Sequence, residues 1–369
     1  MATVYIHIGA PKTATSTLQA ILAQKHKKLL AQRTLYPKNC RYGDAHHVLV
    51  CDLIEKYHGN PMPDLWYGDY PRGQAWSALR SEIRQHEGAI DSVILSTELF
   101  FGQVNGIELM LADVREKLAG HDIKVVVYLR RQDQLYGSFY NQDVKGARQW
   151  PHSAYQFYET HQIFHRSYYE MLKTWSEAFG AENVLVRPYE PVQWPDGNII
   201  RDFCQTTGIY SLRGLVLDRN KSLGVTQMYI KRCLNRVGFD KGDNDEVWKL
   251  LVRLLPERST KDVLYVNRKL YNKYRQEWIK SNNRLAREFL GRENLFYEAI
   301  PAATELQEYR VDLEKVTLFL QALLSHFARS KPAKFRSLFA RAALLILAEQ
   351  DAWIVLGRDK RSALLSWID

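Results

Sequence analysis

Short apolar and β-branched runs alternate with helical patterns over the first two thirds of the chain. The runs that predict strands are Val4–Ile8, Val93–Leu95, Lys124–Leu129 and Val184–Val186. Lys124–Leu129 is almost continuously apolar, which is typical of a strand buried on both faces of a parallel sheet. This alternation predicts an α/β fold in which helices flank a parallel sheet.

Between the strands, the apolar positions change to a helical period. Leu18, Ile21 and Leu22 follow a cluster of hydroxyl residues, which predicts a helix that begins near them. A second helix is expected at Phe164–Phe179, where Gly180 ends it. Residues 34–75 are rich in Pro, Gly, Asn, Asp and Tyr and predict a long loop region.

The pattern changes after about residue 222, where clear strands are no longer predicted. Helices are expected over 225–237, 244–255, 262–292 and 303–329. We therefore predict an α/β core over residues 1–225 and a mainly helical C-terminal extension over residues 226–369.

The tail of the chain carries an apolar stripe at helical spacing. Its members are Leu338, Phe339, Ala342, Leu345 and Ile346. Such a stripe fits a helix on a membrane surface, and it fits equally a helix that packs on the core or on the second subunit of a homodimer.

The composition limits the classes of molecule that this protein is expected to bind. The formal net charge is +10, which would suit nucleic acid, an anionic membrane surface or a polyanionic small ligand. No run of Lys or Arg is long enough for a nucleic-acid tail, and the spread of basic residues fits a solvated basic surface or an enzyme for a polyanionic donor. The four cysteines show no CxxC pairing and no spacing to histidine that would suit a metal, which predicts reduced thiols and no metal site. With no signal peptide and no apolar segment of membrane-spanning length, we expect a cytoplasmic protein.

The first chemical signal lies between the first strand and the first helix. Gly9 and Ala10 are followed by Pro11, Lys12, Thr13, Ala14, Thr15, Ser16 and Thr17. Unpaired N–H groups at a helix N-terminus bind phosphate or sulfate, and the lysine adds a cation. The lysine comes three residues after the glycine and no second glycine precedes it, so the loop differs from the Walker pattern.

This segment resembles a known nucleotide loop. IHIGAPKTATSTLQ (Ile6–Gln19) is similar to the loop that grips the 5′-phosphosulfate of 3′-phosphoadenosine 5′-phosphosulfate (PAPS) in sulfotransferases, where a PKxGT-like sequence follows the first strand. The resemblance implies that residues 11–17 bind PAPS within a P-loop-like sheet. Ala14 stands where members of the family usually carry glycine, and a positive φ there would strain an alanine.

A second segment resembles the other nucleotide motif of the same family. In KVVVYLRRQDQLYGSFYNQ (Lys124–Gln142), Arg130 ends a buried strand and Ser138 follows eight positions later. In sulfotransferases an arginine and a serine at this spacing bind the 3′-phosphate. The physical argument agrees, because ligands of open α/β sheets bind at the carboxyl ends of strands, where a guanidinium can hold a phosphate at two points.

Two shorter segments extend the resemblance. Arg187–Glu190 looks like a recurring segment of the family and adds Tyr189 as a nucleotide contact. Asn220–Leu223 resembles a segment of bacterial members and adds Lys221 near the 3′-phosphate. The RKG-type motif of the cytosolic animal enzymes is not evident.

The resemblance implies in-line transfer of a sulfuryl group without a metal, with 3′-phosphoadenosine 5′-phosphate (PAP) as product. Lys12 would stabilise the charge that develops on the leaving phosphate. A base must take the proton of the acceptor. Glu98, at the end of the second strand, is the first candidate, and His46 and His47 are the others, since histidine titrates near neutrality. His7, inside the first strand, is expected to be a core residue.

The acceptor is not readable from the residues themselves. Bacterial relatives imply a hydroxyl or amine of a surface glycan or glycolipid, as in capsule or lipopolysaccharide, and Trp66, Tyr67 and Tyr70 are candidates for a sugar platform. Two other functions remain open. A P-loop-type kinase would require magnesium, and a non-catalytic nucleotide- or glycan-binding module would lack an effective base.

Overall fold

The chain forms two compact units that are interleaved along the sequence. The computed structural model describes residues 1–59, 61–103, 106–146, 148–161, 166–210, 212, 223–237, 241–255, 263–308 and 311–330. Unit 1 comprises Met1–Leu135, His165–Asp218 and Lys273–Ile300, and unit 2 comprises Tyr136–Phe164, Arg219–Asn272 and Pro301–Asp369. The two units do not divide at residue 225. Segment 136–164 lies before that position and belongs to unit 2, and segment 273–300 lies after it and belongs to unit 1.

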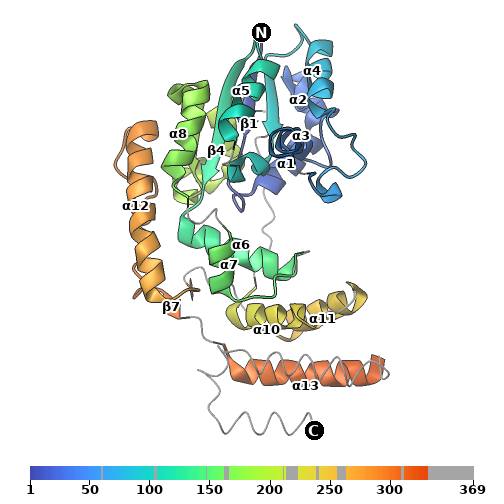
Figure 1. Cartoon of the computed structure of the whole chain (residues 1–369), viewed down its shortest axis with the longest axis vertical. Helices are drawn as coiled ribbons and strands as arrows, with labels where there is room; N and C mark the ends of the chain where they lie inside the picture. The colour runs from blue at the N-terminus through green and yellow to red at the C-terminus, as the bar shows by residue number, and fades with distance from the viewer. Residues whose placement is uncertain are drawn as a thin grey trace. The chain divides into compact units, whose positions relative to one another are not determined.

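Unit 1 is built on a five-stranded parallel sheet with the order β2-β3-β1-β4-β5 (Figure 1). The α/β fold with a parallel sheet flanked by helices is therefore confirmed. β1 lies at the centre, where Thr3 pairs with Ser92 of β3 and with Asp122 of β4. The strands are β1 Thr3–His7, β2 Thr34–Leu35, β3 Ser92–Ser96, β4 Asp122–Leu129 and β5 Val184–Pro188.

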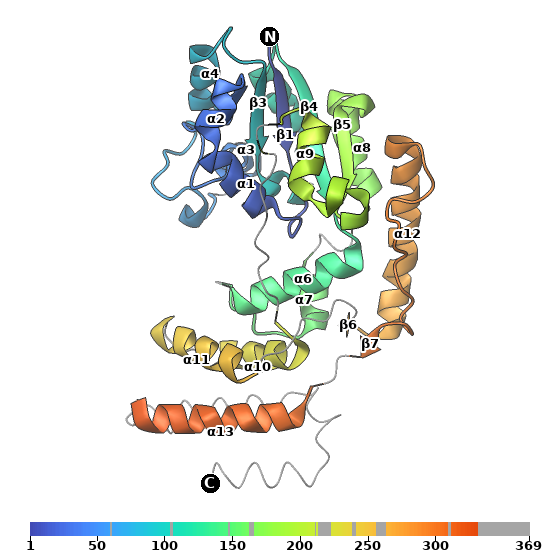
Figure 2. The same ribbon diagram turned by 180° about the vertical axis from the view of Figure 1, so that it is seen from behind.

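Helices cover both faces of this sheet. α1 (Thr15–Gln24), α2 (His26–Ala31) and α9 (Ile199–Thr207) pack on one face, where their apolar side chains meet Val126 and Tyr128 of β4 (Figure 2). α5 (Ile107–Lys117) and α8 (Tyr168–Phe179) lie on the opposite face, with α3 (His47–His58) against α5. The remaining elements of unit 1 are α4 Ala75–Gln85, η1 Asp64–Trp66, η2 Glu98–Gly102, η4 Ala181–Asn183, η5 Pro191–Gln193 and η6 Pro195–Gly197.

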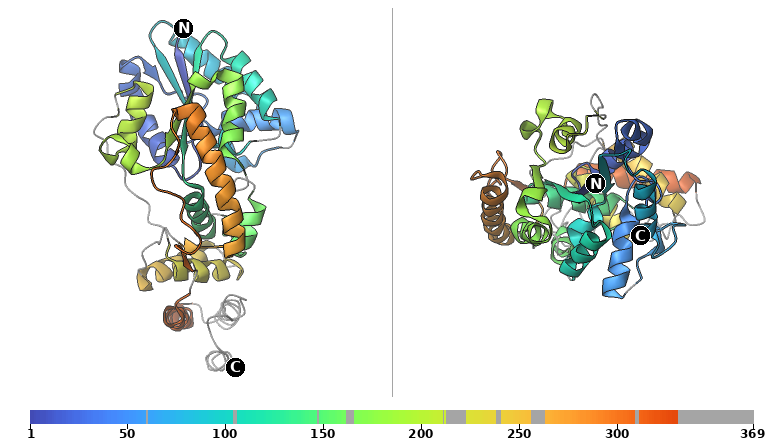
Figure 3. Two further views of the ribbon diagram at one scale, coloured as in Figure 1. Left: turned by 90° about the vertical axis from the view of Figure 1, so that its left-hand side faces the viewer. Right: turned by 90° about the horizontal axis from the view of Figure 1, so that it is seen from above.

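The C-terminal segment of unit 1 packs beside α8 (Figure 3). It includes most of α12 (Arg268–Leu290), on which Ser281 Oγ lies 2.9 Å from Ser167 Oγ and accepts the Tyr169 N–H at 3.2 Å. Beyond the helix, the buried carboxylate of Glu190 accepts backbone N–H groups of the segment that follows, each at 2.8 Å. A segment far along the chain thus completes unit 1.

The predicted loop at 34–75 was wrong in its central part. α3 occupies residues 47–58, and its apolar side chains are buried, including Val48, Leu49, Leu53 and Ile54. The helical spacing of these residues lies between two stretches rich in Gly, Pro and Asn, whose composition dominates the average over the whole region.

Unit 2 is mainly helical, as expected for the C-terminal part. α10 (Val225–Asn235), α11 (Lys241–Leu254) and α13 (Leu313–Ser330) contact one another. The unit also contains α7 (Ala154–Thr160), part of α6 (Gln132–Lys145) and two short parallel strands, β6 Val263–Leu264 and β7 Gln307–Glu308. The prediction that strands end after residue 222 missed this pair, because a run of two residues shows no measurable alternation.

Some predictions concern residues outside the described part of the chain. These are Lys221 and the apolar stripe at 338–346. Among the described residues, no helix is long and apolar enough to cross a membrane. The four cysteines are buried and form no disulfide.

Candidate functional site

The loop between β1 and α1 is anchored directly to β4. After β1 ends at His7, the Ile8 N–H donates to Val126 O at 3.0 Å and the Ala10 N–H donates to Tyr128 O at 3.2 Å. These bonds extend the parallel pairing of β1 and β4 beyond β1 itself. The loop therefore begins beside the last residues of the strand that leads into Arg130.

Two residues of the loop hold positive φ without being glycine. Lys12 has φ 68°, and Ala14, the residue before α1, has φ 60° and ψ 21° in the left-handed region. The alanine at the usual glycine position thus adopts the conformation that favours glycine. Its methyl group cannot cap the helix, and the Ala14 carbonyl oxygen accepts the N–H groups of Thr17 and Leu18, at 3.1 Å and 3.0 Å.

The hydroxyl groups of the loop divide into two kinds. Thr13 and Thr15 are buried, and both donate to the Ala10 carbonyl oxygen, at 2.6 Å and 3.4 Å. These two hydrogen bonds fix the shape of the loop. Ser16 is exposed and Thr17 is half-buried, so these two hydroxyls remain accessible to a ligand.

Gly9 has little room for a side chain. A Cβ at this position would lie 2.8 Å from Thr15 Oγ1 and 3.0 Å from His7 Nε2. His7 is buried, its Nδ1 lies 2.8 Å from Ser96 Oγ, and its Nε2 has no hydrogen-bond partner in the described residues. Burial lowers the pKa of His7 to about 4, so the ring is neutral at pH 7. This fits the expected core role of His7.

Arg130 follows β4 and reaches the loop. Its Nη1 donates to the carbonyl oxygen of Lys12 at 3.0 Å, and its guanidinium lies 5.6 Å from the centroid of the Tyr189 ring. Its own carbonyl oxygen accepts the Tyr168 hydroxyl at 2.8 Å. The Nε atom is buried and has no hydrogen-bond partner among the described residues.

This environment favours an anion. Burial lowers the pKa of the Arg130 guanidinium, which means that the site desolvates a cation without fully compensating its charge. A phosphate placed against the guanidinium would supply that compensation. The structure therefore brings together three of the predicted nucleotide contacts, which are Lys12, Arg130 and Tyr189.

Glu98 lies at the carboxyl end of β3 and is held from two sides. Its Oε2 accepts a hydrogen bond from Gln19 Nε2 of α1 at 3.0 Å, and its Oε1 lies 3.8 Å from His47 Nε2. Its side chain is 24% exposed, which leaves it accessible to a substrate. The two contacts connect the carboxylate to α1, through Gln19, and to α3, through His47.

His47 is oriented by the residue before Glu98. Its Nδ1 lies 2.9 Å from Thr97 Oγ1, which already accepts the Leu99 N–H at 3.3 Å. The Thr97 hydroxyl has one hydrogen and a second lone pair, so it can donate to Nδ1 or accept from it, and in either case it fixes the orientation of the His47 ring. Burial lowers the pKa of His47, and the nearby Glu98 carboxylate partly opposes this.

His46 has a different environment from its neighbour. It is buried, its Nδ1 accepts the Ser96 N–H at 3.1 Å, and its Nε2 lies 3.1 Å from the Pro37 carbonyl oxygen. Both nitrogens are occupied, and burial lowers the pKa of His46 to about 3. With no nitrogen left for a substrate, His46 fits a structural role, and Glu98 and His47 remain as candidates for the base.

The three aromatic residues considered for a sugar platform lie in different environments. Trp66 is half-buried and meets the His47 ring edge-on, at 5.3 Å between centroids. Tyr67 is buried and its hydroxyl donates to Asp52 at 2.9 Å, while Tyr70 donates to the Asn39 carbonyl oxygen. Only Trp66 among the three lies against a candidate catalytic side chain.

Several site residues were not singled out from the sequence. Gln19 ends the segment that resembles the sulfotransferase loop and lies one turn after Thr15, so the helical period could have placed it beside the loop. Thr97 and Tyr168 carried no such signal. Ser138 lies on α6 in unit 2, and its assignment to the 3′-phosphate stays a prediction. No cluster of three or more metal-ligating side chains occurs among the described residues.

No protein-family model matches the chain. It is 31% identical over 192 residues to an uncharacterized protein of Archaeoglobus fulgidus, a match over 51% of this chain and 50% of that protein, so the chain spans about half the length of this relative. A sulfotransferase from Alicyclobacillus acidocaldarius has a crystal structure with 18% identity and a TM-score of 0.37, over 69% of this chain and 96% of that one. These values support no conclusion about activity.

Proposed function

We propose that the protein transfers a sulfuryl group from PAPS to a hydroxyl or amine of a glycan or glycolipid. The observation that carries the proposal is the hydrogen bond from Arg130 to the Lys12 carbonyl oxygen, at 3.0 Å. Lys12 and Arg130 come from the two segments that resemble sulfotransferase nucleotide motifs. They lie together because β1 and β4 are neighbours in the sheet.

The residues around the loop fit a donor with two anionic ends. The N-terminus of α1 and Lys12 suit the 5′-phosphosulfate, since both offer positive charge. The partly compensated guanidinium of Arg130 suits the 3′-phosphate, and the Tyr189 ring lies beside it. PAPS supplies an activated sulfuryl group whose leaving group is PAP.

In the proposed step, a bond forms between the acceptor oxygen and sulfur while the bond from sulfur to the 5′-phosphate oxygen breaks. PAP leaves with the electron pair, and Lys12 stabilises the charge on its phosphate oxygen. Glu98 takes the proton of the acceptor. Gln19 and His47 hold the two oxygens of Glu98, so that the carboxylate keeps one orientation.

An acceptor with a sugar ring fits the surroundings of this carboxylate. Trp66 lies beside His47, and an indole face or edge packs well against the C–H face of a pyranose. The resemblance to bacterial sulfotransferases points in the same direction.

The test is a transfer assay with PAPS and a panel of bacterial surface polysaccharides and glycolipids. Mass spectrometry of the acceptor should show the gain of a sulfuryl group together with the release of PAP, and a chelator should have no effect. Hydrolysis of ATP in the presence of magnesium, with no transfer from PAPS, would contradict the proposal and favour the kinase alternative.

A further inference from the structure

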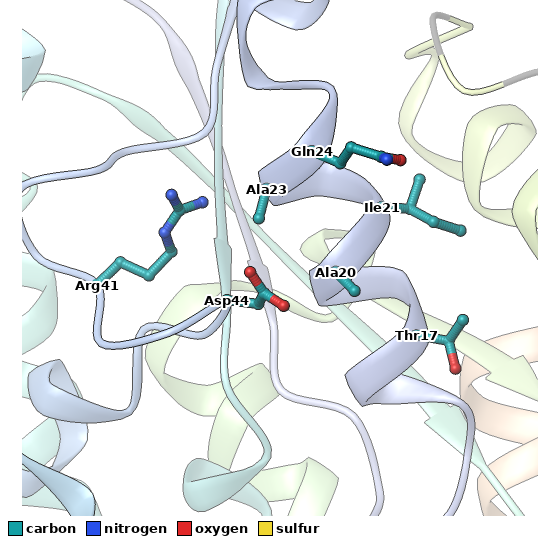
Figure 4. A pocket seen from close by; sticks show the side chains of 7 residues that line it. All are labelled: Thr17, Ala20, Ile21, Ala23, Gln24, Arg41 and Asp44. Atoms are coloured by element: carbon teal, nitrogen blue, oxygen red, sulfur yellow. The ribbon is translucent and has the colours of Figure 1, made fainter. Parts of the chain in front are cut away.

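A cavity of about 450 Å³ opens along the flank of α1, beside the segment that precedes α3 (Figure 4). Its walls come from one helix and one loop. The lining residues are Thr17, Ala20, Ile21, Ala23 and Gln24 of α1, and Arg41 and Asp44 of the loop.

The loop contributes one cation and one anion that do not pair. Within the described residues, the Arg41 guanidinium and the Asp44 carboxylate form neither an ion pair nor a hydrogen bond with protein side chains. Arg41 is half-buried, with its Nη1 buried and unbonded among the described residues, and Asp44 is exposed. A polar ligand that bonds to both groups would supply the partners that they lack.

Tyr36 holds both residues in place. Its ring lies 5.3 Å from the Arg41 guanidinium carbon, and its hydroxyl donates to the Asp44 carbonyl oxygen at 2.6 Å. Tyr36 is 2% exposed, so it belongs to the rigid core beneath the loop. Tyr36 therefore holds the Arg41 guanidinium and the backbone of Asp44, whose carboxylate is exposed.

The α1 wall is suited to a flat, partly apolar ligand. Ala20 and Ala23 are small and allow close approach to the helix, and Ile21 adds apolar surface. Thr17 and Gln24 bring a hydroxyl and an amide to the same wall. This combination of small apolar contacts and polar groups is common in sites that bind small polar molecules.

The two charges limit the chemistry of the ligand. A simple anion would be repelled by Asp44, and a simple cation by Arg41. Adjacent hydroxyl groups satisfy both, because each hydroxyl can donate to a carboxylate and accept from a guanidinium. A neutral ring with a vicinal diol can therefore bond to both groups, while its C–H face fits the small apolar residues of α1.

We propose that this cavity binds a sugar ring, with its vicinal hydroxyls held between Asp44 and Arg41 and its C–H face on Ala20 and Ala23. The cavity reaches Thr17 at the phosphate loop, and Asp44 lies three residues before His47. This position suits a subsite for the acceptor glycan, an assignment that rests on the proposed function. The binding of sugar itself does not depend on that function.

Saturation-transfer difference NMR tests the site directly. The probes are methyl β-D-galactopyranoside and methyl α-D-mannopyranoside, and the matched control probe is (tetrahydropyran-2-yl)methanol, a ring without a vicinal diol. Both glycosides should give signals well above those of the control. Asp44→Asn and Ala20→Leu should each reduce the glycoside signals by about tenfold, because the first removes a charged acceptor and the second fills the floor. Glu87→Gln, which removes an exposed carboxylate elsewhere, should leave them unchanged.

Glycoside signals no stronger than those of the control probe, or signals that survive both substitutions, would overturn the sugar site. Calorimetric titration of the same samples with PAP separates the two proposals. Binding of PAP without a glycoside signal overturns the sugar site alone. A glycoside signal that both substitutions abolish, in a protein that does not bind PAP, supports the sugar site and contradicts the sulfotransferase assignment.

Discussion

The Arg130 guanidinium donates a hydrogen bond from Nη1 to the carbonyl oxygen of Lys12, at 3.0 Å, across 118 positions of sequence. The bond connects the end of β4 to the loop after β1. The carbonyl that accepts this bond belongs to a residue with φ 68°, in the left-handed region. Arg130 thus fixes the backbone of the loop between β1 and α1.

Lys12→Ala should slow transfer far more than it weakens the binding of PAP. In the proposed step, Lys12 mainly stabilises charge that develops as the leaving group departs, and such interactions contribute a factor of about 10² to 10³ in kcat. The measurement combines kcat with calorimetric titration of PAP, and Lys28→Ala serves as an exposed control. Equal losses in kcat and in PAP affinity would contradict the role in leaving-group stabilisation.

Glu98→Gln should lower kcat by a factor of about 10² or more, because the amide keeps the hydrogen-bonding shape of the carboxylate and loses the base. His47→Gln should cost only about tenfold, since it removes an orienting contact. Burial lowers the pKa of His47 below its ordinary 6.5. Protonation of His47 should therefore contribute nothing to the loss of rate on the acid side of the wild-type pH–rate profile above pH 6.5. A larger loss for His47→Gln than for Glu98→Gln would assign the base to His47.

Ala14→Gly should stabilise the protein by about 1 kcal/mol, because glycine relieves the strain of a left-handed alanine. Ala20→Gly, in the exposed interior of the same helix, is the matched control and should destabilise by about 1 kcal/mol. Urea unfolding measures both free energies. A loss of stability in Ala14→Gly similar to that of the control would show that the alanine is not strained.

Lowering the pH should destabilise the fold at pH values well above those at which carboxylates titrate. His7 and His46 have pKa values lowered by burial to about 4 and about 3, against 6.5 in the unfolded chain. Between pH 6.5 and 4 the unfolded state binds more protons, so stability falls as the pH falls. Each of the two histidines contributes about 1.4 kcal/mol per pH unit to this decrease.

The variant that checks this is His46→Gln, followed by urea unfolding from pH 7 to pH 4.5. The dependence of unfolding free energy on pH should be shallower than in the wild type by about 1.4 kcal/mol per unit, whatever the loss at pH 7. An unchanged slope in His46→Gln would mean that this ring is accessible to protons in the folded state.

The central strands and the loop between β1 and α1 could be predicted, because each strand is a contiguous apolar run and the loop is the break that follows the first run. β4 gave the clearest signal, and the loop after β1 carried its lysine and hydroxyls in sequence order. α3 was missed because its helical pattern lies inside a region whose average composition is that of a loop. β2, β6 and β7 are two residues long each and carry no pattern of their own.

The sequence could not distinguish which of the two adjacent histidines faces Glu98. His46 and His47 are adjacent, yet one is buried with both nitrogens bound and the other faces Glu98. Which of two neighbours faces inward depends on where α3 begins, and sequence patterns place such a boundary only within a few residues. The contact between Gln19 and Glu98 joins two segments 79 positions apart and depends on the strand order, which no local pattern shows.

Calorimetric titration with PAP in the absence of metal tests the central assignment most directly. We expect the wild type to bind PAP more tightly than AMP, and Arg130→Lys to lose about tenfold or more of that preference, because lysine cannot make the two-point contact to the 3′-phosphate. Binding of ATP with magnesium, without measurable binding of PAP, would contradict the account and place a nucleoside triphosphate in the loop instead.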